Sequence, residues 1–276
     1  MRRIPWRLAV RMAWLGLVVA WSLFPIALIV LASFKPTATI FDLPPRFLFR
    51  PRLENYALLV EKWPDFFHNL GNSIIITFGA TLLTVAVSTI AGYVYSRYRG
   101  RLLTLSAFFM VFIRMFPPIV ITLPLFPAMN ALGLMDTHLL LILLYATFFV
   151  SLSTWIMKAF IDQIPRELEE AAFVDGATLT QTLVRVTLPL SAHGMIASAV
   201  FVFVFSWNEF LFAFIFTTTR AKTAPLVISE MLGSVTGVDW GAVFAAATIQ
   251  LVPILIFVIL IQKYLVAGLT AGAIKG

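Results

Sequence analysis

Six long runs that are almost free of acidic and basic residues constrain the fold of this chain more than any other feature. A helix needs about 20 mostly apolar residues to cross the hydrocarbon core of a bilayer, and every run is at least that long. They cover Met12–Phe34, Asn69–Ser96, Leu102 to about Met129 with Arg114 inside it, Thr137–Met157, Val186–Asn208 and Trp240–Gln262. The sequence therefore predicts a polytopic membrane protein with six transmembrane helices.

Composition and run length together favour helices over membrane strands. Of the 276 residues, 61% are apolar and 12% are charged, whereas soluble domains average roughly 45–50% apolar and about 25% charged. Strands of a membrane barrel are only about ten residues long and alternate in polarity, which these runs do not. The predicted fold class is all-α. No polar linker divides the chain, so one membrane domain is expected over residues 1–276, with its core at about 69–267.

The distribution of basic residues predicts the orientation in the membrane. Short loops rich in Lys and Arg stay in the cytoplasm, and three such groups fall on one side of a six-span arrangement. They are the four arginines before Met12, the cluster Arg97, Arg99 and Arg101, and Lys263 with Lys275. Both termini are therefore expected in the cytoplasm. The long loop 35–68 opposes this trend with five basic residues but also carries four acidic ones. The net charge of +7 is explained by lipid rather than by nucleic acid.

The longest interior cytoplasmic connection, at about 158–190, has the local features of two short helices. Pro165 suits the first turn of a helix, and the glutamates at 167, 169 and 170 place negative charge near its amide dipoles. Gly176 can adopt the left-handed conformation that ends a helix. A second helix is expected over Thr178–Leu188, before Pro189 and the fifth span. By itself, this pattern also fits an amphipathic helix that rests on lipid headgroups.

Residues of this loop resemble the signature of ATP-binding-cassette (ABC) importer permeases. The matching positions, at the family's spacing, are Glu170, Ala171 and Ala172, then Asp175, Gly176 and Ala177, and finally Leu188 and Pro189. The resemblance implies that the loop is the coupling helix, which sits in a cleft of a separate ATPase. It further implies that Glu170 is the acidic contact to that ATPase and that Gly176 forms the turn. The neighbouring Glu169 is included in the expected coupling set.

The resemblance extends over most of the chain, which is similar to the smaller permease of maltose-type carbohydrate importers. It is carried by Asn72 and Ser73, by Met115–Pro118, by Trp207–Phe210, and by the terminal segment Gly268–Gly276. It implies transport of a sugar, oligosaccharide, polyol or glycerol phosphate across the cell membrane of a prokaryote. The implied partners are a second, different permease, two ATPase subunits and an extracytoplasmic solute-binding protein. This chain would bind no cofactor, and ATP and Mg would be held by the ATPases.

Polar residues within the runs are candidates for the solute pathway or its gate. An unpaired charge at the position of Arg114 would cost at least about 2.5–3.5 kcal/mol on insertion scales, so Arg114 should face protein or water. Asn208 and Glu209 follow Trp207 late in the fifth span. Arg114 and Glu209 are expected to neutralise each other, directly or through water, either as a structural pair or as part of the pathway. Pro117 and Pro118 predict a bent or unwound third span.

Other functional classes lack the residues that they would need. His68, His138 and His193 are dispersed, and the sequence contains no Gly-Lys pair, which excludes a Walker A loop. The chain is therefore not expected to be an enzyme. A secondary transporter driven by an ion gradient remains the alternative, although repeated halves and buried carboxylates are not apparent. The extracytoplasmic loop at about 217–239 is the expected contact for the solute-binding protein.

Overall fold

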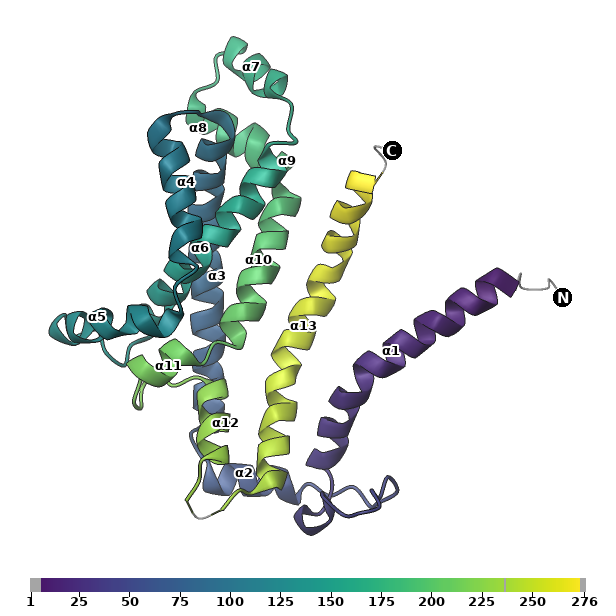
Figure 1. Ribbon diagram of the computed structural model, residues 1–276. Helices are drawn as coiled ribbons and strands as arrows, with labels where there is room; N and C mark the ends of the chain where they lie inside the picture. The colour runs from purple at the N-terminus through teal and green to yellow at the C-terminus, as the bar shows by residue number, and fades with distance from the viewer. Residues whose placement is uncertain (1–5, 236, 274–276) are drawn as a thin grey trace. The chain divides into compact units, whose positions relative to one another are not determined.

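The computed structural model describes residues 6–235 and 237–273, all of whose regular structure is helical (Figure 1). The basic residues before position 6 and the last residues of the terminal segment, 274–276, therefore lie outside the described part. The α-helices are α1 (Trp6–Ser33), α2 (Glu54–Lys62), α3 (Phe66–Arg97), α4 (Arg101–Ile113), α5 (Pro118–Ala131), α6 (His138–Ile161), α7 (Arg166–Val174), α8 (Leu179–Thr182), α9 (Leu188–Leu190), α10 (Ala192–Trp207), α11 (Leu211–Phe216), α12 (Ala224–Leu232) and α13 (Trp240–Ala273). A 3-10 turn, η1 (Thr37–Thr39), and a π-helical segment, η2 (Leu183–Thr187), complete the chain.

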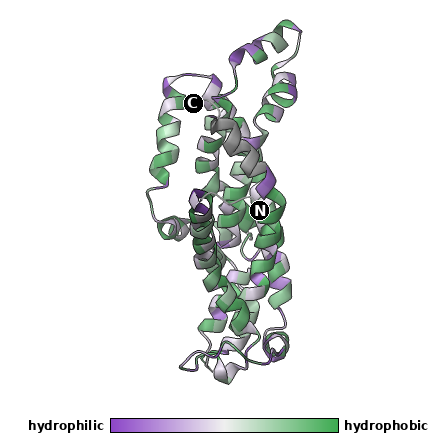
Figure 2. Cartoon of the chain, turned by 90° about the vertical axis from the view of Figure 1, so that its right-hand side faces the viewer, coloured by the Kyte–Doolittle hydropathy of each residue, from purple (hydrophilic) through white to green (hydrophobic). Residues whose placement is uncertain are grey.

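The helices are long and apolar enough to cross a membrane four to six times. The helices α1, α3 and α6 and the segment Trp240–Lys263 of α13 each qualify alone. Two further spans result if each of two bent helix pairs is counted as one span. In Figure 2 the helices are coloured mainly as hydrophobic, and hydrophilic residues gather in the short helices and connections. The all-α prediction is confirmed, and the predicted number of six spans is the upper limit of this range.

Both bent pairs are explained by proline. Helices α4 and α5 meet at 98° where Pro117 and Pro118 remove amide donors from the helix, which confirms the predicted break in the third span. The helices Leu179–Leu190 and Ala192–Trp207 meet at 72°, whereas the sequence predicted an unbroken fifth span from Val186. Pro189 cannot donate to the carbonyl of Arg185, and the chain widens into η2 just before it. The straight part of that span therefore begins only at Ala192.

The chain divides into two compact units, which are described separately. One contains residues up to Phe67 with Val227–Val252, and the other contains His68–Leu226 with the chain from Pro253. In the first unit, Asn55 donates to the carbonyl oxygens of Ser33 and Lys35 at 2.8 and 2.7 Å, which ties α2 to the end of α1. Most side chains of α1 are exposed. An apolar helix with so little internal packing needs lipid or a partner helix to cover it.

The second unit carries the candidate functional residues on a packed group of helices. Helices α3, α6 and α10 run alongside one another, and α6 packs most extensively against α10 (Figure 1). Their shared core includes Ile76, Leu141, Phe149 and Val202, all buried. Close approach of α3 to α6 depends on Gly92, since a β-carbon there would lie 2.7 Å from Cβ of Met157. At one end of this group, α7 extends beyond the long helices.

Candidate functional site

The segment at 165–177 forms a short helix whose two ends are specified locally. Pro165 is the N-cap residue of α7, and Glu167 and Glu169 lie in its first turn, where negative charge is stabilised. At its end Gly176 has φ of +82°. The amide of Gly176 donates to Phe173 and that of Ala177 donates to Ala172, the hydrogen-bond pattern of a Schellman motif. The predicted helix and the glycine turn are both confirmed.

The second helix of the loop begins as predicted but is not uniform. Thr178 accepts a hydrogen bond from the amide of Gln181, and the Gln181 side chain accepts one from the amide of Thr178. This capping box was missed at the sequence level, although the pattern Thr-x-x-Gln signals it. In place of one helix over Thr178–Leu188, the chain forms α8, the π-helical η2 and α9 in succession. Pro189 lies at the second position of α9.

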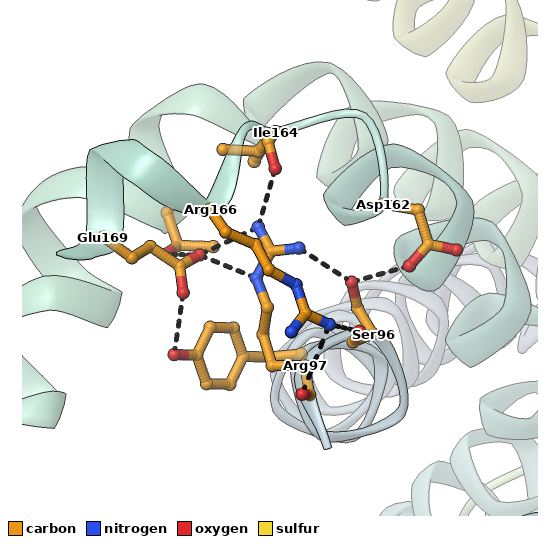
Figure 3. Close-up of polar contacts among 8 residues, drawn as sticks. Ser96, Arg97, Asp162, Ile164, Arg166 and Glu169 are labelled. Carbon is orange, nitrogen blue, oxygen red and sulfur yellow. Dashed lines mark hydrogen bonds and ion pairs between the residues drawn. The ribbon is translucent and has the colours of Figure 1, made fainter. Parts of the chain in front are cut away.

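Glu169 is turned inward and holds α7 against the end of α3. Its carboxylate forms an ion pair with Arg97 at 2.9 Å, and both side chains are more than 90% buried. It also accepts hydrogen bonds from the hydroxyls of Tyr93 at 3.2 Å and Thr187 at 3.0 Å (Figure 3). With three side chains already bonded to it, Glu169 can act on a partner only indirectly, by positioning α7. The Glu169 clamp, as we call Glu169 with Arg97, Tyr93 and Thr187, was not foreseen as a unit.

Most of the predicted coupling residues are exposed or half-buried, and they lie on the other side of α7, in the turn after it, or in α9. The exposed members are Glu170, Ala171, Asp175, Gly176 and Pro189, and those that are half-buried are Ala172, Ala177 and Leu188. Large apolar side chains lie among them, since Val174 is 87% exposed and Phe173 is 44% exposed. An exposed surface with carboxylates and apolar side chains on a short helix is a typical protein-docking surface. The coupling roles of individual residues remain predictions.

A second group of polar contacts joins the start of the loop to α3. Arg97 donates to the carbonyl of Ile164 at 3.0 Å, and Arg166 donates to the carbonyls of Ser96 and Arg97 at the end of α3 (Figure 3). These bonds satisfy backbone groups that a helix end leaves free. Asp162 accepts from Lys158 and Ser96. Partial burial opposes ionisation of Asp162, but these bonds prevail and lower its pKa.

Arg114 and Glu209 have separate partners, so the predicted direct neutralisation does not occur. Arg114 donates to the carbonyl of Phe148 at 2.8 Å, and its guanidinium lies 4.7 Å from the centre of that ring. Glu209 accepts from the amides of Phe212 at 2.9 Å and Ala213 at 3.4 Å. Among the ion pairs of the described side chains, none includes either residue. Each charge instead satisfies backbone groups near a helix break or helix start.

The remaining pathway candidates have diverse environments. Trp207 is 2% exposed and packs parallel to Phe203, whereas Asn208 is exposed and donates to the carbonyl of Val204. Pro117 and Pro118 form the break between α4 and α5. Arg114 lines a largely apolar cavity of about 530 Å³ together with Leu125 and Phe212. The structure thus gives these residues positions at breaks and helix ends, and their roles in a pathway remain predictions.

A polar joint that the sequence analysis missed forms at the opposite end of the helices. The Asp136 carboxylate accepts hydrogen bonds from the consecutive backbone amides of residues 218–221 and from the hydroxyls of Thr218 and Thr219. Burial would raise the pKa of Asp136, but these amides lower it well below its usual range. Asn72 donates to the carbonyls of Arg220 and Lys222 and pairs with His138 at 2.7 Å. The joint fixes the start of the loop predicted to face the solute-binding protein.

Comparisons with known proteins agree with this arrangement. Residues 84–271 match the family model described as the binding-protein-dependent transport system inner membrane component. The trehalose/maltose transport system permease protein MalG of Thermococcus litoralis is 40% identical over 92% of each chain. The trehalose transport system permease protein SugB of Mycobacterium tuberculosis is 38% identical over 94% of this chain and 95% of SugB.

Solved structures show the same fold. A chain of a bacterial ABC transporter involved in the import of the acidic polysaccharide alginate aligns with a TM-score of 0.75 and 22% identity, covering 93% of this chain and 95% of its own. The described residues contain no cluster of His, Asp or Glu that could hold a metal ion.

None of these comparisons supports the alternative of a secondary transporter. The chain belongs to the family of inner membrane components of binding-protein-dependent transport systems, the membrane-spanning permeases of ABC importers.

Proposed function

We propose that this chain forms half of the translocation pathway for a sugar or related solute in the cell membrane of a prokaryote. It would pair with a second, different permease, two ATPase subunits and an extracytoplasmic solute-binding protein, with ATP and Mg held by the ATPases. Relatives named for trehalose, maltose and diacetylchitobiose transport support the carbohydrate class. Both termini and α7 would then lie in the cytoplasm.

The observation that carries the proposal is the two-sided construction of α7. Its inner side is fixed to α3 through the Glu169 clamp, and its outer side presents Glu170 with exposed apolar residues. A helix that is rigidly connected to a long span and free on its other side can transmit a displacement. We therefore infer that closure of the ATPases moves α7, and that α7 moves the membrane helices as a rigid body to open the pathway outward.

Reconstitution tests this proposal. The chain, co-expressed with its genomic neighbours and placed in proteoliposomes with the solute-binding protein, should accumulate labelled trehalose or maltose only with ATP. Glu170→Lys should abolish ATP-dependent uptake while the spans remain inserted. Glu61→Lys, at an exposed glutamate of α2 outside the coupling loop, is the matched control and should transport normally. Uptake by the chain without any ATPase subunit would overturn the proposal.

A further inference from the structure

Two cavities of opposite chemical character meet beside the junction of α3, α4 and α6. The first, of about 600 Å³, has mainly apolar walls that include Leu103, Phe108 and Val111. The second, of about 620 Å³, is lined mostly by charged and polar side chains, among them Arg166 and Glu167. Tyr95, Arg99 and Lys158 line both cavities, so the apolar and polar spaces are adjacent. A ligand that fills both must itself be amphipathic.

The polar cavity has an excess of positive charge. Four basic side chains line it, against two acidic ones; they are Arg97, Arg99, Lys158 and Arg166, with Asp162 and Glu167. Arg97 is neutralised by Glu169, and Lys158 by Asp162. Arg99 is exposed and forms no ion pair or hydrogen bond among the described side chains. Lys158 has three donor hydrogens and uses only one on Asp162. The free donors at the meeting point of the cavities therefore suit a phosphate.

The apolar cavity lies where a bilayer interface is expected. Its rim includes Tyr98, which is 49% exposed, and Trp155, which is 39% exposed. Tyr and Trp are enriched at the headgroup level of membranes, because their rings are amphipathic. The apolar part of α3 ends at Arg97, beside this rim, so Phe108 and Val111 on α4 extend from the headgroup level into the hydrocarbon region. A chain of methylene groups would cover them.

We propose that the joined cavities bind one anionic phospholipid of the cytoplasmic leaflet. Its phosphate lies between Arg99 and Lys158, and one acyl chain follows Leu103, Phe108 and Val111. Basic pockets between membrane helices on the cytoplasmic side are suited to acidic headgroups. This inference rests on the orientation in the proposed function. The lipid would stabilise the turn between α3 and α4, next to the Glu169 clamp.

Native mass spectrometry of the purified transporter complex in detergent tests the lipid site directly. The complex is titrated with phosphatidylglycerol or with phosphatidylcholine of the same acyl chains. The wild type should retain phosphatidylglycerol preferentially. Arg99→Gln and Lys158→Gln should each weaken that binding by roughly fivefold, with little change for phosphatidylcholine. Ala107→Phe, which fills the apolar cavity, should weaken the binding of both lipids. Arg185→Gln, which lines neither cavity, should bind both lipids as the wild type does.

Three results would overturn the lipid site. The first is equal phosphatidylglycerol binding by the wild type and the Arg99 and Lys158 variants. The second is displacement of the lipid by soluble glycerol phosphate at equal concentration, because the acyl chain would then add nothing. The third is a crosslink from Phe108→Cys to a partner subunit, because protein would then occupy the groove. Lipid binding is measured without transport. A negative result for the lipid site therefore does not affect the proposed function, which ATP-driven uptake tests separately.

Discussion

Two adjacent glutamates in α7 have opposite environments. Glu169 holds α7 against the rest of the chain, and Glu170 is available to contact a partner protein. Glu169 is 5% exposed and bonded to three side chains, whereas Glu170 is exposed. Their positions in the sequence could not distinguish them, because Arg97 and Tyr93 lie more than 70 residues earlier in the chain. Only the packing of α7 on α3 shows which carboxylate is committed internally. Substitution should therefore affect the two residues differently.

Glu169→Gln should loosen α7 without unfolding the chain. Removing one charge of a buried ion pair leaves the other uncompensated and costs about 3 kcal/mol or more, here as Arg97 without its partner. Hydrogen exchange should show faster exchange of the amides in residues 166–174. Glu170→Gln is the matched control, with exchange rates close to those of the wild type. Equal protection in the two variants would contradict the Glu169 clamp.

Asp136 should stabilise the polar joint in a pH-dependent manner. Its pKa is lower in the folded protein than in the unfolded chain, so its stabilisation is complete above the unfolded value of about 3.9 and declines as pH falls toward the folded pKa. Asp136→Asn should lower the free energy of unfolding by about 2 kcal/mol at pH 7.

Thermal unfolding in detergent at several pH values checks this dependence on pH. The stability difference between the wild type and Asp136→Asn should shrink below about pH 4. Asp65→Asn, at an exposed carboxylate, serves as the control and should change little. A stability difference that stays constant from pH 7 to pH 3 would show that ionised Asp136 is not the stabilising species.

At the scale of elements, local sequence signals predicted the helix and turn of the coupling loop well, but they predicted only some of the contacts between distant segments. Pro165, the acidic first turn and Gly176 are local signals, and each produced the predicted feature. The break of the third span followed from its prolines. The bend at Ser191 was missed, because Pro189 was assigned to the boundary of a span rather than to its interior. The polar joint was missed because Asp136 precedes the backbone amides that donate to it by about 82 residues.

Gly176→Ala should weaken the turn after α7 through backbone strain alone. A left-handed conformation costs a residue with a β-carbon about 1–2 kcal/mol, and no atom lies within 4 Å of the added carbon. Limited proteolysis should cleave the segment 161–190 more rapidly than in the wild type. Gly100→Ala also adds a methyl group in open space, but at extended backbone, and should leave cleavage unchanged. Equal cleavage of both variants would show that the turn tolerates a side chain.

Gly92→Leu should separate α3 from α6. A β-carbon at Gly92 would lie 2.7 Å from Cβ of Met157 and 2.9 Å from the backbone nitrogen of Lys158, and such overpacking costs about 1–3 kcal/mol or more. The melting temperature in detergent should fall accordingly. Gly71→Leu on the same helix meets no neighbour within 4 Å and provides the control. A similar melting temperature for both variants would mean that α3 and α6 do not approach so closely.

At the scale of the whole molecule, much of the apolar surface has no partner within the chain. Only 6% of the most apolar window of α1 is buried, compared with 44% for α6. Long runs without charged residues predicted which segments enter the membrane, but they could not distinguish helices that pack within the chain from helices that are covered by lipid or by other subunits. The family explains this incompleteness, because such permeases work inside an assembly. We infer that the partner ATPase contacts this chain at α7.

Site-specific crosslinking can detect this contact, because the chain contains no cysteine and a single one can be introduced at a chosen position. Glu170→Cys on the exposed side of α7 and Leu132→Cys at the exposed turn after α5 can each be treated with a reagent that joins a thiol to a nearby lysine. In the assembled transporter, position 170 should crosslink to the ATPase and position 132 should not. Absence of the crosslink at position 170, in a complex that still couples ATP hydrolysis to uptake, would show that the ATPase does not dock on the exposed side of α7.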